Sequence, residues 1–288
     1  MNICIPTLPH QHIAQLLSLA EQQDPLSGGE VWLVGAGPGD VELLTLKALR
    51  VIQQADVVVY DRLVSAPVMA LIPQGALRID VGKAPGNHRL AQPQINQLLV
   101  DLAQSGKRVV RLKGGDPFIF GRGGEEMAHC QQHGVVCHIV PGITAAMGCA
   151  AACGIPLTHR DLAQSVRFVT GQGSQGDADI DWASLVAARQ TLVFYMGLAN
   201  SGMISQRLIA NGLAASTPVA IIERGTQPQQ RVTTGALGTL SMIIERDAIV
   251  TPALLIIGDV VSLYQRKDSA GDHWPNALLM QNNAIASQ

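Results

Sequence analysis

The segment RLKGGDPFIFGRGGEE, Arg111 to Glu126, follows the short apolar run of Lys107 to Val110, which predicts a buried parallel strand. Gly114 and Gly115 permit backbone conformations that are closed to other residues, and they let a ligand approach the main chain closely. Asp116 lies just past the carboxyl end of this strand, where open α/β sheets place their ligands. The spacing therefore predicts a loop that holds a small molecule, although GGDP alone fits an ordinary strand-to-helix turn equally well.

Strand-like and helix-like segments alternate on both sides of this loop. In the first half, strands are expected at 31–34, 56–60, 77–81, 108–112 and 135–140, and helices at 41–54, 92–104 and 125–133. In the second half, helices are expected at 144–153 and 201–210, and strands at 166–170, 191–196, 218–223 and 253–257. The alternation in the first half implies a mostly parallel sheet with helices on both of its faces.

We therefore expect an α/β protein with two α/β domains, at residues 29–141 and 142–265. An N-terminal extension at 1–28 precedes them, with one expected helix at 10–23 and a linker at 27–29, and a polar tail follows at 266–288. Clefts between domains are common ligand sites, so a cleft between these two is the expected place for a small molecule.

Composition excludes several classes of protein. With 47% hydrophobic and 15% charged residues, the 288-residue chain can build sizeable cores, and a formal net charge of −2 argues against nucleic-acid binding through bulk charge. Five scattered cysteines, an odd number, do not form a disulfide framework and favour reduced thiols in the cytoplasm. No apolar run approaches the roughly 20 residues of a membrane span, and the N-terminus lacks the pattern of a signal peptide.

Three expected strand ends carry polar motifs. GAGPGD, residues 35–40, superficially resembles a dinucleotide fingerprint, but Asp40 occupies the third glycine position and a nicotinamide site is therefore disfavoured. Asp61 and Arg62 end the second strand; such pairs are usually solvated, yet a partly desolvated carboxylate there could accept a proton. Lys83 ends the third strand, where it is either a solvated charge or a group for anion binding or proton transfer.

Five potential metal ligands lie close together at His129, Cys130, His133, Cys137 and His138. His129 and His133 are one helical turn apart, as in some zinc pairs. Gly134 breaks that helix, however, and no second CxxC or HxxH motif completes a site. We expect no metal.

Taken together, the motifs resemble those of the uroporphyrinogen-III C-methyltransferases, within the tetrapyrrole methylase family. The resemblance covers roughly Glu30 to Tyr264, and its motifs occur in the expected order. They are VGAGPGDVELLTLKA (34–48), DRLV (61–64), GKAPG (82–86), RLKGGDPFIFGRGGEE (111–126), PGITAA (141–146), GIPLTHRD (154–161), FYMG (194–197) and ERGT (223–226).

This resemblance implies the class III methyltransferase architecture, two α/β domains with a cofactor cleft between them, and S-adenosylmethionine as co-substrate without a metal. The positions that match the family's cofactor contacts are Pro38, Gly114, Gly115, Asp116, Ile119, Thr144, Ala145, Met196 and Gly225. Asp61 would be the proton acceptor and Lys83 the proton donor. A homodimer is also implied.

The implied reaction transfers two methyl groups, to carbons 2 and 7 of uroporphyrinogen III, and gives precorrin-2 and S-adenosylhomocysteine for sirohaem or cobalamin synthesis. That substrate carries eight carboxylates, which guanidinium groups bind well. The hypothesised carboxylate clamps are Arg62, Arg89, Lys113, Arg122 and Arg160.

Three other functions remain open. A nicotinamide-dependent oxidoreductase would have to bind a dinucleotide at GAGPGD, against which Asp40 counts. A non-catalytic ligand-binding protein could keep the cleft without the chemistry, although Asp61 and Lys83 count against it. The third is a related methylase that acts on a later corrin intermediate.

Overall fold

The computed structural model describes residues 25–82, 90–172 and 180–265. The chain divides into two compact units, Met1–Cys149 and Ala150–Gln288, so the division falls eight residues after the Pro141/Gly142 boundary expected from the sequence. The expected helix at 10–23, the tail at 266–288, Lys83 and Arg89 lie outside the described residues.

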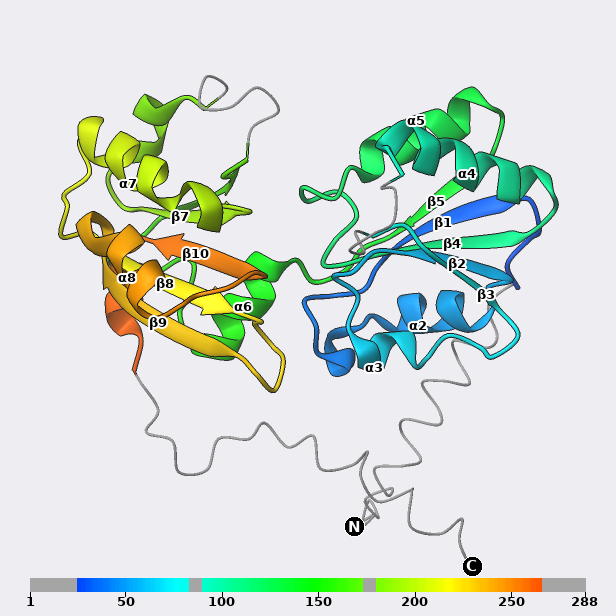
Figure 1. Cartoon of the computed structure of the whole chain (residues 1–288), viewed down its shortest axis with the longest axis horizontal. Coiled ribbons are helices and arrows are strands. Elements are labelled where there is room, and N and C mark those ends of the chain that lie inside the picture. The colour runs from blue at the N-terminus through cyan, green and yellow to red at the C-terminus, as the bar shows by residue number, and fades with distance from the viewer. Residues whose placement is uncertain (1–24, 83–89, 173–179, 266–288) are drawn as a thin grey trace, which may run out of the picture. The chain divides into compact units, whose positions relative to one another are not determined.

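The first unit contains a five-stranded sheet in the order β3-β2-β4-β1-β5, and every pairing in it is parallel. Helices cover both faces, with α4 and α5 on one and α2 and α3 on the other (Figure 1). The expected parallel sheet with two covered faces is therefore confirmed. The strands are β1 (Glu30–Gly35), β2 (Val57–Tyr60), β3 (Leu77–Asp80), β4 (Arg108–Lys113) and β5 (Cys137–Val140). The helices are α2 (Leu46–Gln53), α3 (Ala66–Met69), α4 (Gln92–Gln104), α5 (Gly123–Gln132) and α6 (Ala145–Cys153), which spans the division between the units.

Successive side chains of each strand point to opposite faces of the sheet, so the first unit has two hydrophobic cores, one on each face. Trp32 and Val34 of β1 pack in one core with residues of α2 and α3, whereas Val31 and Leu33 pack in the other with residues of α4 and α5. In β4, Val109 belongs to the core beneath α4 and α5, so the side chains of Arg111 and Lys113 also face those helices. The sheet thus directs two cations into a buried layer.

The expected continuous helix at 41–54 is wrong. A 3-10 helix, η1 (Val41–Leu43), comes first, and the extended residues Leu44 and Thr45 separate it from α2. Asp40 caps η1 by accepting a hydrogen bond from Glu42 N at 2.9 Å, and Thr45 caps α2 by accepting one from Ala48 N at 3.1 Å. Each of these two residues starts a separate helix, because its side chain accepts from a backbone N–H that has no partner within the first turn.

The second unit contains a five-stranded mixed sheet in the order β6-β7-β10-β8-β9. Only β6 and β7 pair in parallel; the other three pairings are antiparallel. Its strands are β6 (Ser165–Thr170), β7 (Gln190–Tyr195), β8 (Pro218–Glu223), β9 (Arg231–Ala236) and β10 (Ala253–Ile257). Its helices are α7 (Ser201–Ala210) and α8 (Leu240–Arg246), with 3-10 helices η3 (Trp182–Val186), η4 (Leu198–Asn200), η5 (Leu237–Thr239) and η6 (Asp259–Leu263). No helix of the described ranges is long and apolar enough to cross a membrane.

An ion pair joins the amino ends of two neighbouring strands of the first sheet. Arg108 Nη2 lies 2.6 Å from Asp56 Oδ1, and this hydrogen bond is the main reason why the pKa of Asp56 falls from 3.8 to about 2. Because folding lowers this pKa, the stabilisation is fully present above pH 3.8 and is lost as the pH falls towards 2. Both side chains are about one-third exposed, so solvent screening limits the contribution to about 1 kcal/mol or less.

We therefore expect Asp56→Asn to lower the free energy of unfolding by up to about 1 kcal/mol at pH 7. The difference from the unmodified protein should shrink below pH 3.8 and nearly vanish at about pH 2. Urea unfolding of both proteins across this range measures it. A difference that stayed constant with pH would contradict the assignment to the ion pair.

Candidate active site

Loops from several strands meet at the carboxyl edge of the first sheet. Gly37, after β1, and Gly115, after β4, form an isolated β-bridge, in which Gly115 N donates to Gly37 O at 2.7 Å and Gly37 N donates to Gly115 O at 3.2 Å. Ala36 N also donates to Lys113 O at 2.8 Å. These bonds hold the GAGPGD turn and the GGDP loop side by side.

Glycines allow a third loop, the one after β5, to pack against this bridge. A Cβ atom on Gly35 would lie 2.5 Å from Gly142 N, and a Cβ atom on Gly142 would overlap the carbonyl oxygen of Gly115. No side chain fits at either place, so three main chains come together without intervening atoms. We call these three residues, Gly35, Gly115 and Gly142, the glycine cradle; they let three loops meet through their main chains at the carboxyl edge of the sheet.

Asp116 ties two of these loops together with both of its carboxylate oxygens. Oδ1 accepts a hydrogen bond from Phe118 N at 2.8 Å, and Oδ2 accepts one from Gly142 N at 3.0 Å. The carboxylate therefore fixes the GGDP loop to the loop after β5. Nothing in this arrangement is readable from the GGDP spacing, because Asp116 and Gly142 are far apart in the sequence.

Asp61 follows β2 at the same edge. Its Oδ1 accepts a hydrogen bond from Leu63 N at 3.0 Å, and its Oδ2 lies 3.6 Å from Arg111 Nη2 on the neighbouring strand β4. Its side chain is 25% exposed, so it is partly desolvated but accessible. Leu63 in turn packs against the GGDP loop, since a Cβ atom on Gly114 would lie 2.6 Å from Leu63 Cβ. The expected proton acceptor thus lies beside the cradle loop.

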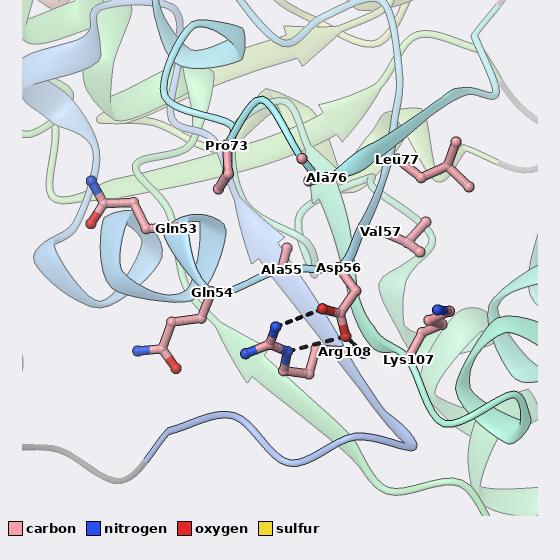
Figure 2. A pocket seen from close by; sticks show the side chains of 11 residues that line it. Gln53, Gln54, Ala55, Asp56, Val57, Pro73, Ala76, Leu77, Lys107 and Arg108 are labelled. Atoms are coloured by element: carbon pink, nitrogen blue, oxygen red, sulfur yellow. Dashed lines mark hydrogen bonds and ion pairs between the residues drawn. The ribbon is translucent and has the colours of Figure 1, made fainter.

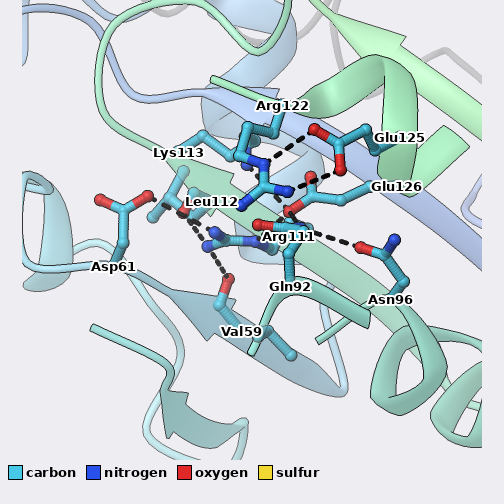
Figure 3. Close-up of polar contacts among 10 residues, drawn as sticks. All are labelled: Val59, Asp61, Gln92, Asn96, Arg111, Leu112, Lys113, Arg122, Glu125 and Glu126. Atoms are coloured by element: carbon cyan, nitrogen blue, oxygen red, sulfur yellow. Dashed lines mark hydrogen bonds and ion pairs between the residues drawn. The ribbon is translucent and has the colours of Figure 1, made fainter. Parts of the chain in front are cut away.

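A buried charged cluster lies behind Asp61 (Figure 3). Glu126 of α5 is fully buried, and its Oε1 accepts from Lys113 Nζ at 2.9 Å, Arg111 Nε at 3.1 Å and Gln92 Nε2 at 3.2 Å. Burial, followed by the repulsion of Arg111, lowers the pKa of Lys113, whereas Glu126 raises it. Lys113 is only 3% exposed, and its ammonium group is held by Glu126.

The remaining predicted residues of the first unit are placed as follows. Pro38 and Ile119 are half-buried, in the loops after β1 and β4. Thr144 is buried, and its carbonyl oxygen accepts hydrogen bonds in the first turn of α6, which Ala145 begins. Arg62 is exposed beside Asp61. Arg122, also exposed, pairs bidentately with Glu125 at 2.7 and 2.8 Å, which raises the pKa of Arg122 and lowers that of Glu125.

Three predicted residues belong to the second unit. Met196 follows β7 with a left-handed backbone, φ 53°, and its side chain is 49% exposed. Gly225 is buried and follows β8, between Arg224 and Thr226, which both have positive φ. Met196 and Gly225 lie at the same edge of their sheet, because β7 and β8 are each antiparallel to β10. Arg160 is exposed, and its carbonyl oxygen accepts a hydrogen bond from Arg189 Nη2.

A pocket of 610 Å³ lies at the opposite end of the first sheet (Figure 2). Residues at the amino ends of β2, β3 and β4 line it, among them Asp56, Leu77 and Arg108. Asp61 is not among the residues that line this pocket. The two charged residues that do, Asp56 and Arg108, already form an ion pair with each other. In α/β sheets of this kind the carboxyl edge is the functional one, so we assign the site to the glycine cradle and Asp61.

The candidate metal ligands meet only in pairs: the ring centroids of His129 and His133 lie 4.3 Å apart, and the side chains of Cys130 and Cys137 share a hydrogen bond. Among residues 25–82, 90–172 and 180–265, no three His, Cys, Asp or Glu side chains converge on a position for a metal ion. His129 Nε2 donates a hydrogen bond to Gln97 Oε1 at 3.0 Å, and His138 stacks on Trp32 at 4.1 Å while contacting Glu30.

Sequence reasoning missed the roles of Arg111 and Glu126. Glu126 occurs in GRGGEE, where a glutamate near a helix start is usually a solvated charge. The available signal was the pair of cations at alternate positions of an apolar strand, Arg111 and Lys113, which predicts a buried counter-charge on the helix that covers that face.

Comparisons with known proteins identify the family of the chain. Residues 30–241 match the family Tetrapyrrole (Corrin/Porphyrin) Methylases. The chain is 60% identical over 239 residues to the siroheme synthase of Azotobacter vinelandii, covering 83% of this chain and 52% of that protein. It is 56% identical over 274 residues to siroheme synthase 2 of Yersinia enterocolitica, covering 94% and 56%. The chain therefore spans about half the length of these curated relatives.

Two solved structures are covered over nearly their whole length by about four-fifths of this chain. The crystal structure of uroporphyrin-III C-methyl transferase from Thermus thermophilus, complexed with S-adenyl homocysteine, aligns with a TM-score of 0.71 and 40% identity, covering 82% of this chain and 100% of that one. A cobalt precorrin-4 methyltransferase aligns with a TM-score of 0.72 and 28% identity, covering 81% and 96%. The two α/β units are therefore those of the class III methyltransferases, and the chain belongs to the tetrapyrrole (corrin/porphyrin) methylase family.

Proposed function

We propose that the chain is an S-adenosylmethionine-dependent uroporphyrinogen-III C-methyltransferase, which methylates carbons 2 and 7 of its substrate to give precorrin-2 and S-adenosylhomocysteine. The observation that carries the proposal is a partly desolvated carboxylate, Asp61, beside a glycine cradle at the carboxyl edge of the sheet. The likeness to the Thermus thermophilus enzyme, over the whole of that chain, supports it. Sirohaem or cobalamin synthesis is the proposed pathway, and the cytoplasm the proposed location.

The residues of the cradle fit a bound S-adenosylmethionine. A Cβ atom on Gly35 or Gly142 would collide with main-chain atoms, so the three loops present backbone rather than side chains at this edge, which supports binding of the ligand through main-chain groups. Pro38, Gly114, Ile119, Thr144 and Ala145 belong to the same three loops, and we propose that they line its site. Bound there, S-adenosylmethionine supplies a methyl group already activated on a sulfonium, so the protein has to align it and exclude water. Asp116 keeps the cradle in shape. Met196 and Gly225 stay predictions from the family resemblance.

Asp61 has the properties of a proton acceptor. Methylation of a pyrrole carbon leaves a cationic substrate, which must then lose a proton from carbon. Arg111 and the amide of Leu63 hold the two oxygens of Asp61, which fixes the direction in which the carboxylate points. Lys83, the predicted proton donor, stays a prediction.

Exposed arginines are the proposed partners of the substrate's carboxylates. Arg62, Arg122 and Arg160 are exposed, as such clamps require. Lys113 is a poor clamp, because its ammonium group is buried and bonded to Glu126. We therefore assign Lys113 to the internal cluster and leave Arg89 as a prediction.

Arg62→Ala should raise the KM for uroporphyrinogen III about 10- to 100-fold while kcat changes less than about threefold. One lost charge-assisted hydrogen bond is worth roughly 1.5–3 kcal/mol of binding, and Arg62 binds rather than reacts in this proposal. Steady-state kinetics with varied substrate measure both constants, and Arg50→Ala, in the last turn of α2, is the control. A large fall in kcat with an unchanged KM would contradict the clamp role.

The experiment that tests the function combines binding and turnover. Calorimetry with S-adenosylmethionine and, separately, NADH should show binding of the first only. Addition of uroporphyrinogen III should then yield precorrin-2, which is identified by its absorbance and by a mass gain of two methyl groups. Binding without methylation of uroporphyrinogen III, but with methylation of a cobalt-precorrin, would favour the second candidate, a later corrin methylase, to which the 28% identity to cobalt precorrin-4 methyltransferase points. Sedimentation tests the proposed homodimer.

A further inference from the structure

Glu126 lies at the centre of a buried cluster of charged side chains. The cluster belongs neither to the glycine cradle nor to the exposed arginines proposed to bind the substrate. Its side chain has no exposed surface, while those of Arg111 and Lys113 are only 5% and 4% exposed. Three donors converge on its Oε1, and Oε2 has no hydrogen-bond partner among the described residues. Charges buried to this degree usually destabilise a protein unless they are well paired, so an arrangement that packs two cations against one carboxylate calls for a functional reason.

The guanidinium of Arg111 is held on nearly every side. Nε donates to Glu126 Oε1 at 3.1 Å, and Nη1 donates to the carbonyl oxygens of Leu112 at 3.1 Å and Val59 at 3.4 Å. A planar guanidinium fixed at these points has no freedom left to rotate. Nη2 is consequently directed at Asp61 Oδ2, 3.6 Å away (Figure 3).

The same carboxylate balances the charge that faces Asp61. Arg111 and Lys113 bring two positive charges to the covered face of β4, and Glu126 and Asp61 bring two negative ones. Without Glu126, both cations would be left with Asp61, which is the more exposed acid. Arg111 could then move towards Asp61 and draw the carboxylate away from the position in which Leu63 N holds it.

We propose that Glu126 is a positioning residue for methyl transfer, which acts through Arg111 to hold the carboxylate of Asp61 in place. Being fully buried, Glu126 does not touch the substrate itself. The inference rests on the proposed role of Asp61 and extends it to a second layer of residues. It also gives Lys113 a purpose, since its ammonium group donates to the same oxygen of Glu126 that Arg111 contacts, and so helps to hold that carboxylate.

The test is the isosteric variant Glu126→Gln, assayed for methylation of uroporphyrinogen III. We expect kcat to fall about 10- to 100-fold, while the KM for uroporphyrinogen III and the affinity for S-adenosylmethionine change less than about threefold. A double-mutant cycle with Asp61→Asn supplies the decisive readout. If Glu126 acts through Asp61, Glu126→Gln should have no further effect on kcat in the Asp61→Asn background. Independent, multiplicative losses would overturn the proposal.

Two more variants separate positioning from folding. Glu126→Gln combined with Lys113→Met removes one charge of each sign, and should recover thermal stability relative to Glu126→Gln without recovering kcat. Recovery of kcat together with stability would overturn the proposal. Asp56→Asn breaks an ion pair at the other end of β4 and should leave kcat unchanged.

The outcomes distinguish this inference from the proposed function. Full turnover in Asp61→Asn would remove the proposed proton acceptor and, with it, the role of Glu126. Loss of turnover in Asp61→Asn beside full turnover in Glu126→Gln would overturn only the positioning role.

Discussion

Asp61→Asn is expected to lower kcat for methylation of uroporphyrinogen III by about 10²- to 10⁴-fold, the range of a general base. Asparagine keeps the oxygen that accepts a hydrogen bond from Leu63 N, so the local turn should survive. It removes the charge that faces Arg111 and the ability to take up a proton. Single-turnover assays with excess enzyme measure the appearance of the methylated product that has lost its proton, and calorimetry should show an S-adenosylmethionine affinity within about threefold of normal.

The neighbouring strand offers a matched control. Asp80 ends β3 beside β2, and its Oδ1 accepts a hydrogen bond from Gly82 N at 2.7 Å, the same two-residue turn that Asp61 makes. No ion pair between Asp80 and another described residue is found. Asp80→Asn should therefore retain turnover. Equal losses in the two variants would mean that turns at this edge matter for folding, and that Asp61 is no base.

The sequence predicted the first sheet well because its signals are local. Short apolar runs that alternate with segments of helical periodicity predict parallel strands joined by helices. The helix α4 has the bounds expected from the sequence, Gln92 to Gln104. The second sheet was harder, since β9 reads RVTTGA, an edge strand with alternating polar residues and no apolar run. Its mostly antiparallel pairing depends on how the chain returns through β10, and no local pattern encodes that path.

The candidate site shows the same division between local and long-range information. Motifs identified Asp61 and the GGDP loop, and the carboxyl ends of parallel strands bring both to one edge. The partner of Asp61 was not predictable, because the register that places Arg111 opposite Val59 joins residues 52 positions apart. Lys113 was mistaken for a clamp of a substrate carboxylate for the same reason: its burial depends on α5, which follows β4 in the chain and supplies Glu126 as its partner. The cofactor cleft between the domains stays a prediction.

Gly142→Ala is expected to weaken S-adenosylmethionine binding at least tenfold and to lower the free energy of unfolding by about 1–3 kcal/mol, as overpacking does. The added methyl would overlap the carbonyl oxygen of Gly115 and lie 2.8 Å from Gly35 Cα. Both obstacles are main-chain atoms, so no side chain can rotate to relieve the overlap. Calorimetry measures the affinity and urea unfolding the stability.

The overlap caused by Gly142→Ala can be relieved only if the loop after β5 moves away from the GGDP loop. Because both loops belong to the proposed binding site, this movement should weaken S-adenosylmethionine binding. Movement of Gly142 away from Gly115 would break the hydrogen bond from Gly142 N to Asp116 Oδ2 and loosen the GGDP loop. Gly75→Ala is the control, because a Cβ atom there meets nothing within 4 Å in a turn of the same unit. Loss of stability without loss of affinity in Gly142→Ala would show that the cradle is a packing feature, and that S-adenosylmethionine binds elsewhere.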